Sequence, residues 1–202
     1  MKRARQGSFP KTDGVAATGR SAIRAVFLVG FMGAGKTSVG QVLGKKLGWR
    51  FEDLDELVQL REKRSIEAIF RESGERAFRA AEHAALRQVL FDVASRSQVV
   101  ALGGGAFVHS ANAKLLEEAG FPSVFLDAPV EELFNRCRAQ AIARPLRRDA
   151  DDFRNLYESR RPAYLEALLR IDTQGKDLEE IATEIATHLG LEPVPDETGV
   201  AT

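Results

Sequence analysis

The chain is poor in cysteine, with Cys137 as its only one among 202 residues. A disulfide within the chain is therefore impossible, and a metal cluster held by several thiolates is excluded. Long apolar runs are also missing, because no segment approaches the roughly 20 apolar residues that a membrane-spanning helix needs. We therefore expect a cytoplasmic protein with no membrane partner, in which Cys137 packs on a helix as a small apolar residue.

Neither sign of charge is in excess, because Lys+Arg and Asp+Glu both number 29. A chain without net charge has no global field that would attract nucleic acid or an acidic membrane, and we expect neither as a partner. A composition of 44% apolar and 29% charged residues is typical of a globular domain. Since no second domain is evident, a monomer is the expected state.

The two ends of the chain differ from its middle. Residues 1–20 are basic, polar and aperiodic, and they lack the apolar centre of a secretory signal. They predict a disordered tail, with an organellar transit segment as the alternative. Residues 191–202 are expected to fray, which leaves a single domain over residues 21–190.

A glycine-rich turn follows the first apolar segment, in the stretch AVFLVGFMGAGKTSVGQVLG at residues 25–44. The spacing G-x-x-x-x-G-K-[ST] is formed by Gly30, Gly35, Lys36 and Thr37. A strand before this pattern and helical spacing after it predict a loop whose main-chain N–H groups surround a phosphate at a helix N-terminus. In that motif the lysine bridges the β- and γ-phosphates and the hydroxyl binds Mg²⁺.

Apolar runs and helical patterns alternate along the rest of the chain. This alternation predicts an α/β fold in three layers, with a five-stranded parallel sheet flanked by helices. Ligands of such sheets bind beyond the carboxyl ends of the strands. The expected strands are residues 25–29, 49–52, 98–102, 123–127 and 170–173. The expected helices include residues 54–61, 65–72 with Ser65 as cap, 75–94, 110–119, 152–169 with Pro162 kinking or dividing it, and 178–189.

Two carboxylates follow the second expected strand, at Asp53 and Asp55. Side chains two apart on an extended segment share a face, so both are expected to point toward the phosphate loop. A phosphoryl-transfer enzyme needs one carboxylate near Mg²⁺ and another that orients the acceptor hydroxyl and takes its proton. The alternative for either residue is a cap of the following helix.

Glycines and arginines follow other elements. Gly103, Gly104 and Gly105 after the third strand leave bare backbone that a substrate can approach, or form a sharp turn. Arg144 lies in a polar stretch at about residues 139–152, which is expected to be a mobile lid that closes over the γ-phosphate and excludes water. Arg79 near Glu82, and Arg160, are two more candidate anion ligands. Each arginine alone is also compatible with an ordinary surface cation.

Taken together, the segments GFMGAGKT, FEDLD, FRESGERAFRAAE, the triple glycine, ARPL and RRPAY resemble the shikimate kinases, in that order and over residues 23–190. This family belongs to the P-loop kinases that share the fold of nucleoside monophosphate kinases. The resemblance implies ATP-dependent phosphorylation of the 3-hydroxyl of shikimate, which gives shikimate 3-phosphate and ADP on the pathway to chorismate and aromatic amino acids.

The resemblance also implies roles for single residues. Arg79 and Arg160 would hold the shikimate carboxylate, and Asp55 would bind its hydroxyls and act as the base. The implied catalytic residues are Lys36, Asp55 and Arg144. The implied ATP-binding residues are Gly33, Ala34, Gly35, Lys36, Thr37, Ser38 and Arg144. The implied substrate-binding residues are Asp55, Arg79, Gly103, Gly104, Gly105 and Arg160. Mg²⁺ would be bound by Thr37 and, through water, by Asp53.

Some features depart from the family pattern. The lid arginine is followed by PLRRDADD, where the family usually has a second leucine. At the place of the arginine that contacts adenine stands Cys137, between Arg136 and Arg138, and the choice between these two stays open.

Two other functions are compatible with the phosphate loop. One is a kinase of another small molecule, such as gluconate or a nucleoside monophosphate, and the other is an inactive nucleotide-binding regulator. Arg79 and Arg160 favour an anionic acceptor. The presence of Lys36, Asp53 and Asp55 argues against an inactive protein.

Overall fold

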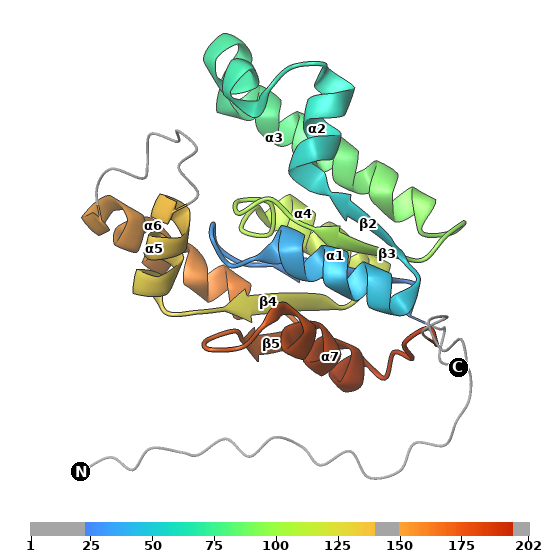
Figure 1. Ribbon diagram of the computed structural model, residues 1–202. Coiled ribbons are helices and arrows are strands. Elements are labelled where there is room, and N and C mark those ends of the chain that lie inside the picture. Colours follow the sequence, from blue (N-terminus) through green and yellow to red (C-terminus); the bar gives the residue numbers. More distant parts are fainter. Residues whose placement is uncertain (1–22, 140–149, 196–202) are drawn as a thin grey trace, which may run out of the picture.

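The computed structural model describes residues 23–139 and 150–195. Its centre is a parallel sheet of five strands in the order β2-β3-β1-β4-β5, with helices on both faces (Figure 1). The prediction of a three-layer α/β fold is therefore confirmed. The strands are β1 Ala25–Val29, β2 Arg50–Asp53, β3 Gln98–Ala101, β4 Ser123–Asp127 and β5 Leu169–Asp172. The helices of the described residues are α1 Lys36–Leu47, α2 Leu54–Glu62, α3 Ile66–Asp92, α4 Ser110–Ala119, α5 Val130–Ala139, α6 Ala150–Tyr164 and α7 Leu178–Leu189.

The strands in the middle of the sheet are the most apolar ones. All residues of β1, β3 and β4 are buried, whereas the edge strands β2 and β5 are partly exposed. A parallel strand covered by helices on both faces needs apolar side chains on both sides, which explains the uninterrupted AVFLV of β1. Leu28 at the centre pairs with Ala101 on one side and Val124 on the other.

The helices form two layers. α1 and α7 lie side by side in front of the sheet in Figure 1, and α3 and α4 pack together on the opposite face. Gly40 lets α1 approach the sheet, because a Cβ atom there would lie 2.3 Å from Cε2 of Phe51. α7 starts with a reciprocal capping box formed by Asp177 and Glu180.

Most predicted boundaries hold. The bounds of β4, α4 and α7 agree with the prediction, and Ser65 caps α3 by accepting from the Ala68 N–H. α3 is interrupted at Gly74, where φ is 78° and ψ is 174°, so the two predicted helices exist as one element with a break. The prediction was wrong for α6, which ends at Tyr164 and not near residue 169. Pro162 has no N–H to continue the helical ladder, and the helix stops two residues later.

Three strand ends meet at one edge of the sheet. β2, β3 and β1 are neighbours and parallel, so Asp53, the triple glycine after β3 and the phosphate loop after β1 all lie at the carboxyl edge. The topology therefore brings together segments that lie up to about 70 residues apart in the sequence, in the place where α/β sheets bind ligands.

Candidate active site

The phosphate loop joins β1 to α1. Gly33 and Gly35 have φ angles of 80° and 84°, a left-handed conformation that favours glycine. The Lys36 ammonium folds back over the loop and donates to the carbonyls of Gly30 at 2.9 Å and Phe31 at 3.0 Å. The N-terminus of α1, with its positive dipole end, faces the same loop. This combination of N–H groups, dipole and cation is suited to a phosphate chain.

A hydroxyl and a carboxylate meet beside the phosphate loop. The Thr37 hydroxyl donates to Oδ2 of Asp53 at 2.8 Å. The other oxygen of Asp53 accepts from the Asp55 N–H at 3.0 Å and so caps α2. The capping alternative and the placement near Thr37 are thus both true of Asp53, one for each of its oxygens.

The expectation that Asp53 and Asp55 share a face of an extended segment was wrong. α2 begins at Leu54, directly after the Asp53 cap, so Asp55 lies in the first turn of a helix and not on a strand. The helical turn separates the two side chains. Asp53 faces Thr37, and Asp55 lines a second pocket next to the turn after β3.

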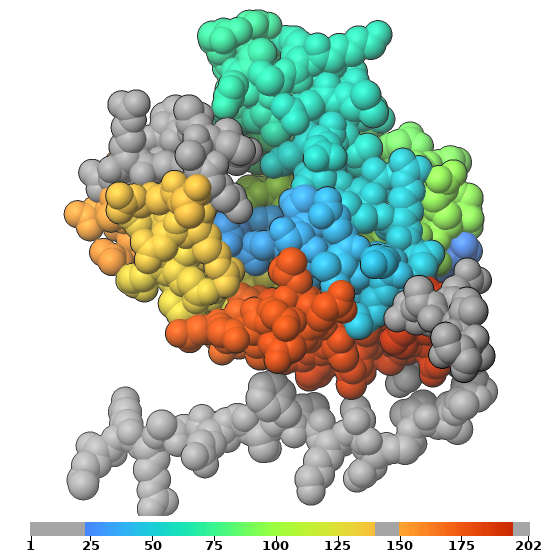
Figure 2. Space-filling view, viewed as in Figure 1, coloured from blue at the N-terminus to red at the C-terminus, as the bar shows by residue number. Residues whose placement is uncertain are grey.

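This second pocket, called here the acceptor pocket, has a volume of about 150 Å³. In the space-filling view a recess opens between the α2–α3 pair and the phosphate-loop region (Figure 2). All six predicted substrate-binding residues line the acceptor pocket, although they come from α2, α3, α6 and the turn after β3. The pocket residues are Met32, Asp55, Ile66, Phe70, Phe78, Arg79, Glu82, Gly103, Gly104, Gly105 and Arg160.

Residues 103–105, the glycine turn, lie against the charged side chains of the pocket. A Cβ atom at Gly103 would be 2.4 Å from Oδ1 of Asp55. A Cβ at Gly105 would be 2.8 Å from both terminal nitrogens of Arg79. At Gly104 the nearest atom would be 3.7 Å away, with Nη1 of Arg160 at 3.9 Å. A Cβ atom at Gly103 or Gly105 would therefore displace the end of the Asp55 or the Arg79 side chain.

Arg79 is fixed by two carboxylates of its own helix. Its Nη1 donates to both oxygens of Glu82, at 3.2 and 3.0 Å, and its Nη2 donates to Glu75 at 3.3 Å. The Glu82 side chain is only 1% exposed. Burial raises the pKa of Glu82, and the Arg79 guanidinium opposes this shift. A buried carboxylate thus holds one edge of a guanidinium that also lines the acceptor pocket.

Arg160 reaches the pocket from the other side. Its Nη1 donates to the Gly104 carbonyl at 3.4 Å, and its guanidinium lies 5.9 Å from the centre of the Phe31 ring. The buried Tyr164 hydroxyl donates to the same carbonyl of Gly104. Burial raises the pKa of Tyr164 to about 12, so the phenol stays protonated at neutral pH.

A charged cluster holds the helix that carries Arg160. Asp127, the last residue of β4, accepts from Tyr157 Oη at 3.1 Å, from Arg161 Nη2 at 3.1 Å and from Arg170 Nε at 2.9 Å. Two of these donors lie on α6 and the third on β5. Because Asp127 is buried, this network fixes α6 against the sheet at the same edge as the pocket.

The remaining predicted residues lie elsewhere or are not described. Arg144, most of the predicted lid, residues 1–20 and residues 196–202 lie outside the described residues. In the described part of the C-terminal tail, the Val194 N–H donates to the Lys46 carbonyl at 2.9 Å. Arg136 pairs with Glu132 of its own helix, and Arg138 lies 5.8 Å from the ring of Phe134, so the choice for adenine stays open. Cys137 is 2% exposed and belongs to the core, as predicted.

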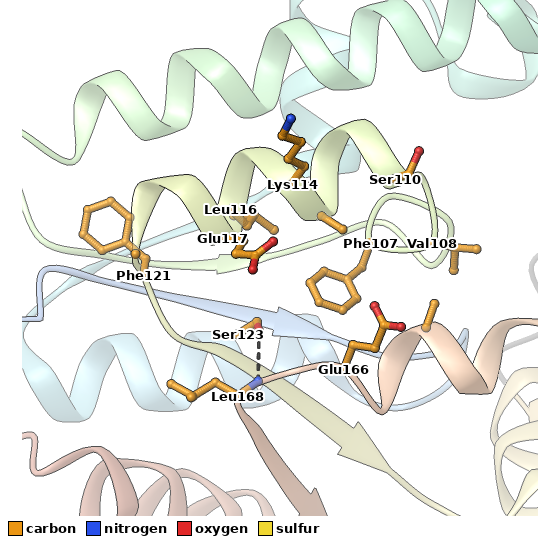
Figure 3. Close-up of a pocket in the computed structure, with 13 residues that line it drawn as sticks. Phe107, Val108, Ser110, Lys114, Leu116, Glu117, Phe121, Ser123, Glu166 and Leu168 are labelled. Atoms are coloured by element: carbon orange, nitrogen blue, oxygen red, sulfur yellow. Dashed lines mark hydrogen bonds between the residues drawn. The ribbon is translucent and has the colours of Figure 1, made fainter.

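A larger hollow lies elsewhere. It has a volume of about 880 Å³ and runs between α4 and the end of α6, with Phe107, Leu116 and Phe121 among its walls (Figure 3). None of the predicted site residues lines it. Volume alone therefore does not single out the active site, whereas the acceptor pocket combines Asp55 and Arg160 with the phosphate loop nearby.

Within residues 23–139 and 150–195, no three His, Cys, Asp or Glu side chains gather in a way that could hold a metal ion. No helix in that part of the chain is long and apolar enough to cross a membrane.

Comparisons with known proteins agree with the geometry. The family model described as shikimate kinase matches residues 32–190. A shikimate kinase of Geobacter sulfurreducens is 44% identical over 169 residues, which cover 82% of this chain and 91% of the relative. One of Persephonella marina is 38% identical over 163 residues, covering 81% and 97%. The solved shikimate kinase of Acinetobacter baumannii in complex with shikimate aligns with a TM-score of 0.74 at 32% identity, covering 84% and 94%.

Replacing Tyr164 by Phe tests the buried hydroxyl behind the glycine turn. The variant should lose about 1 kcal/mol in the free energy of unfolding near pH 8, because the Gly104 carbonyl loses a donor. The ordinary pKa of a tyrosine phenol is 10.0, and burial raises that of Tyr164 to about 12. The free energy of unfolding of the wild type should therefore fall above about pH 10, where the phenol ionises in the unfolded chain first. The variant has no phenol at this position and lacks this contribution. Urea denaturation at stepped pH measures both effects. A difference between the two proteins that stays constant to about pH 11 would contradict the assigned burial.

Proposed function

The chain belongs to the shikimate kinase family, and we propose how its residues divide the work as it transfers the γ-phosphoryl group of ATP to the 3-hydroxyl of shikimate. The observation that carries the proposal is that Asp55, Arg79 and Arg160 line one small pocket beside the phosphate loop. A carboxylate at one place and two guanidinium groups at another suit an acceptor with hydroxyls on one edge and an acid group on the other.

Arg79 and Arg160 bind the shikimate carboxylate. Both reach the glycine turn, Arg160 next to Gly104 and Arg79 next to Gly105. Guanidinium forks form charge-assisted hydrogen bonds with carboxylates, each of which contributes on the order of 2 kcal/mol. Arg79 is already pinned by Glu82, so little of its conformational freedom remains to be lost on binding.

Asp55 orients the hydroxyl that is phosphorylated. Its carboxylate lies against Gly103, two residues from the place where Arg79 meets the turn. In phosphoryl transfer, positioning of the acceptor in line with the γ-phosphate supplies most of the catalysis, and a carboxylate next to the hydroxyl takes its proton. Asp55 is therefore the proposed base.

The nucleotide binds at the phosphate loop. The main-chain N–H groups of residues 33–38 and the Lys36 ammonium hold the β- and γ-phosphates. The oxygens of Thr37 and Asp53 fit Mg²⁺, because they are hard donors 2.8 Å apart at the exposed edge of the loop. Thr37 would bind the ion directly and Asp53 through water, and the ion would offset the charge of the phosphates.

Some parts of the proposal rest on the sequence. Arg144 is the proposed lid residue that neutralises charge on the γ-phosphate and keeps water out of the site. The balanced charge and the single domain at residues 21–190 favour a cytoplasmic monomer that binds neither nucleic acid nor membranes.

An assay of ADP release tests the function against its alternatives. We expect turnover with shikimate and at most about 1% of that rate with gluconate or a nucleoside monophosphate, because an acceptor without the matching acid and hydroxyls leaves the pocket's charges unpaired. ATP with no acceptor provides the background rate. Faster turnover of gluconate would favour that kinase, and background rates with every acceptor would favour the inactive regulator.

Replacing each residue of the glycine turn by alanine should distinguish the role of Asp55 from the role of Arg79. Gly103→Ala displaces Asp55, so kcat should fall about 100-fold or more. Gly105→Ala displaces Arg79, so the KM for shikimate should rise about tenfold or more while kcat falls less.

Gly104→Ala serves as the matched comparison, because its Cβ meets nothing closer than 3.7 Å. It should be the mildest of the three substitutions in steady-state kinetics, and all three should keep the KM for ATP within about threefold. Equal effects of the three on every constant would mean that the turn only supports the fold.

A further inference from the structure

A buried amide lies behind the acceptor pocket. Asn112 on α4 is 1% exposed, and the sequence patterns did not single it out. Its Nδ2 donates to the Ala106 carbonyl at 3.1 Å and to Oε2 of Glu82 at 3.4 Å. Its Oδ1 lies 2.8 Å from Nδ1 of His83. One side chain of α4 thus contacts two successive residues of α3 and the residue that follows the glycine turn.

The chemistry of these partners determines which way the amide points. The Ala106 carbonyl can only accept, and the Glu82 oxygen at this contact already accepts from Arg79, so the NH₂ group must face them. The carbonyl oxygen of Asn112 then faces His83, whose Nδ1 must carry a proton to donate. A donating His83 therefore stabilises the same orientation of Asn112 that lets it support Glu82.

Asn112 also holds the glycine turn. The Ala106 N–H donates to the Gly103 carbonyl at 2.9 Å and closes the turn, while the Ala106 carbonyl accepts from Asn112. The same amide is therefore bonded to the turn that Asp55 touches and to the carboxylate that aims Arg79.

We propose that Asn112 is a positioning residue for the acceptor, oriented by His83. By donating to the buried Glu82, Asn112 fixes the carboxylate that holds Arg79. By donating to the Ala106 carbonyl, it also holds the glycine turn in place beside Arg79. This inference rests on the proposed role of Arg79 as a ligand of the shikimate carboxylate. It predicts that Asn112 affects acceptor binding without touching the acceptor.

Steady-state kinetics of Asn112→Leu test this role, since leucine has a similar shape and no hydrogen-bonding groups. The KM for shikimate should rise about tenfold, because a buried hydrogen bond to a charged group is lost. The KM for ATP should stay within about twofold, since the phosphate loop is not bonded to Asn112.

Gln98→Leu is a matched control. Gln98 is another buried amide that bonds to α3, since it is 2% exposed and its Nε2 donates to the Val89 carbonyl at 2.8 Å, away from the acceptor pocket. Its loss should lower stability to a similar extent and leave the KM for shikimate unchanged. If both variants raise this KM equally, or neither does, the positioning role of Asn112 is refuted.

Substitution of His83 provides a second test, in which the replaced side chain is only partly buried. His83→Leu removes the donor that orients the amide and should raise the KM for shikimate about threefold. His83→Gln retains a side-chain N–H and should restore much of the loss. Equal constants for both variants and the wild type would overturn the proposed orientation, also in the case that Asn112→Leu does not fold.

Arg79→Ala, measured in parallel, distinguishes failure of this inference from failure of the proposed function. If Arg79→Ala raises the KM for shikimate about 30-fold or more and Asn112→Leu does not change it, only the inference about Asn112 is wrong. If Arg79→Ala also leaves this KM unchanged, Arg79 is not a ligand of the acceptor, and the proposed function of the pocket fails with it.

Discussion

The acceptor pocket depends on how closely the bare backbone of the glycine turn is approached by charged side chains. Asp55 occupies the space in which a Cβ of Gly103 would lie, and Arg79 does the same two residues later. Arg160 meets the turn between them, by donating to a carbonyl. A carboxylate and two guanidinium groups thus lie against three consecutive residues, and we propose that this spacing matches a molecule with hydroxyls at one end and an acid group at the other. β3 carries this turn and lies between β2 and β1, so the turn lies next to the phosphate loop.

The electrostatics of the pocket follow from the same arrangement. Glu82 is buried, its pKa is raised by burial, and Arg79 is the cation that opposes this shift. An ion pair of this kind costs desolvation energy and is weak evidence for stability. We propose that the pair instead preorganises Arg79, because a guanidinium held at one edge can bind a ligand with its remaining N–H groups. The Asp127 cluster provides the equivalent support for α6, which carries Arg160.

Features coded by adjacent residues were predictable from the sequence, and features that depend on packing were not. The phosphate loop, the alternation of strands and helices along the chain and the break between residues 72 and 75 follow from local patterns of glycine, apolar residues and caps. The face shared by Asp53 and Asp55 was predicted wrongly, because Asp53 caps α2 and thereby turns the next residues into a helix. Asn112 was missed, since its contact with Glu82 spans 30 residues and depends on how α4 is rotated against α3. No periodicity in one sequence reports that rotation.

The most direct test of the account is a crystal structure of the protein with shikimate and ADP. The account predicts the shikimate carboxylate within hydrogen-bond distance of both Arg79 and Arg160, and its 3-hydroxyl at Asp55, facing the phosphate loop. Shikimate bound in the large hollow between α4 and α6, or in the acceptor pocket with its carboxylate at Asp53 or away from both arginines, would contradict the central claim.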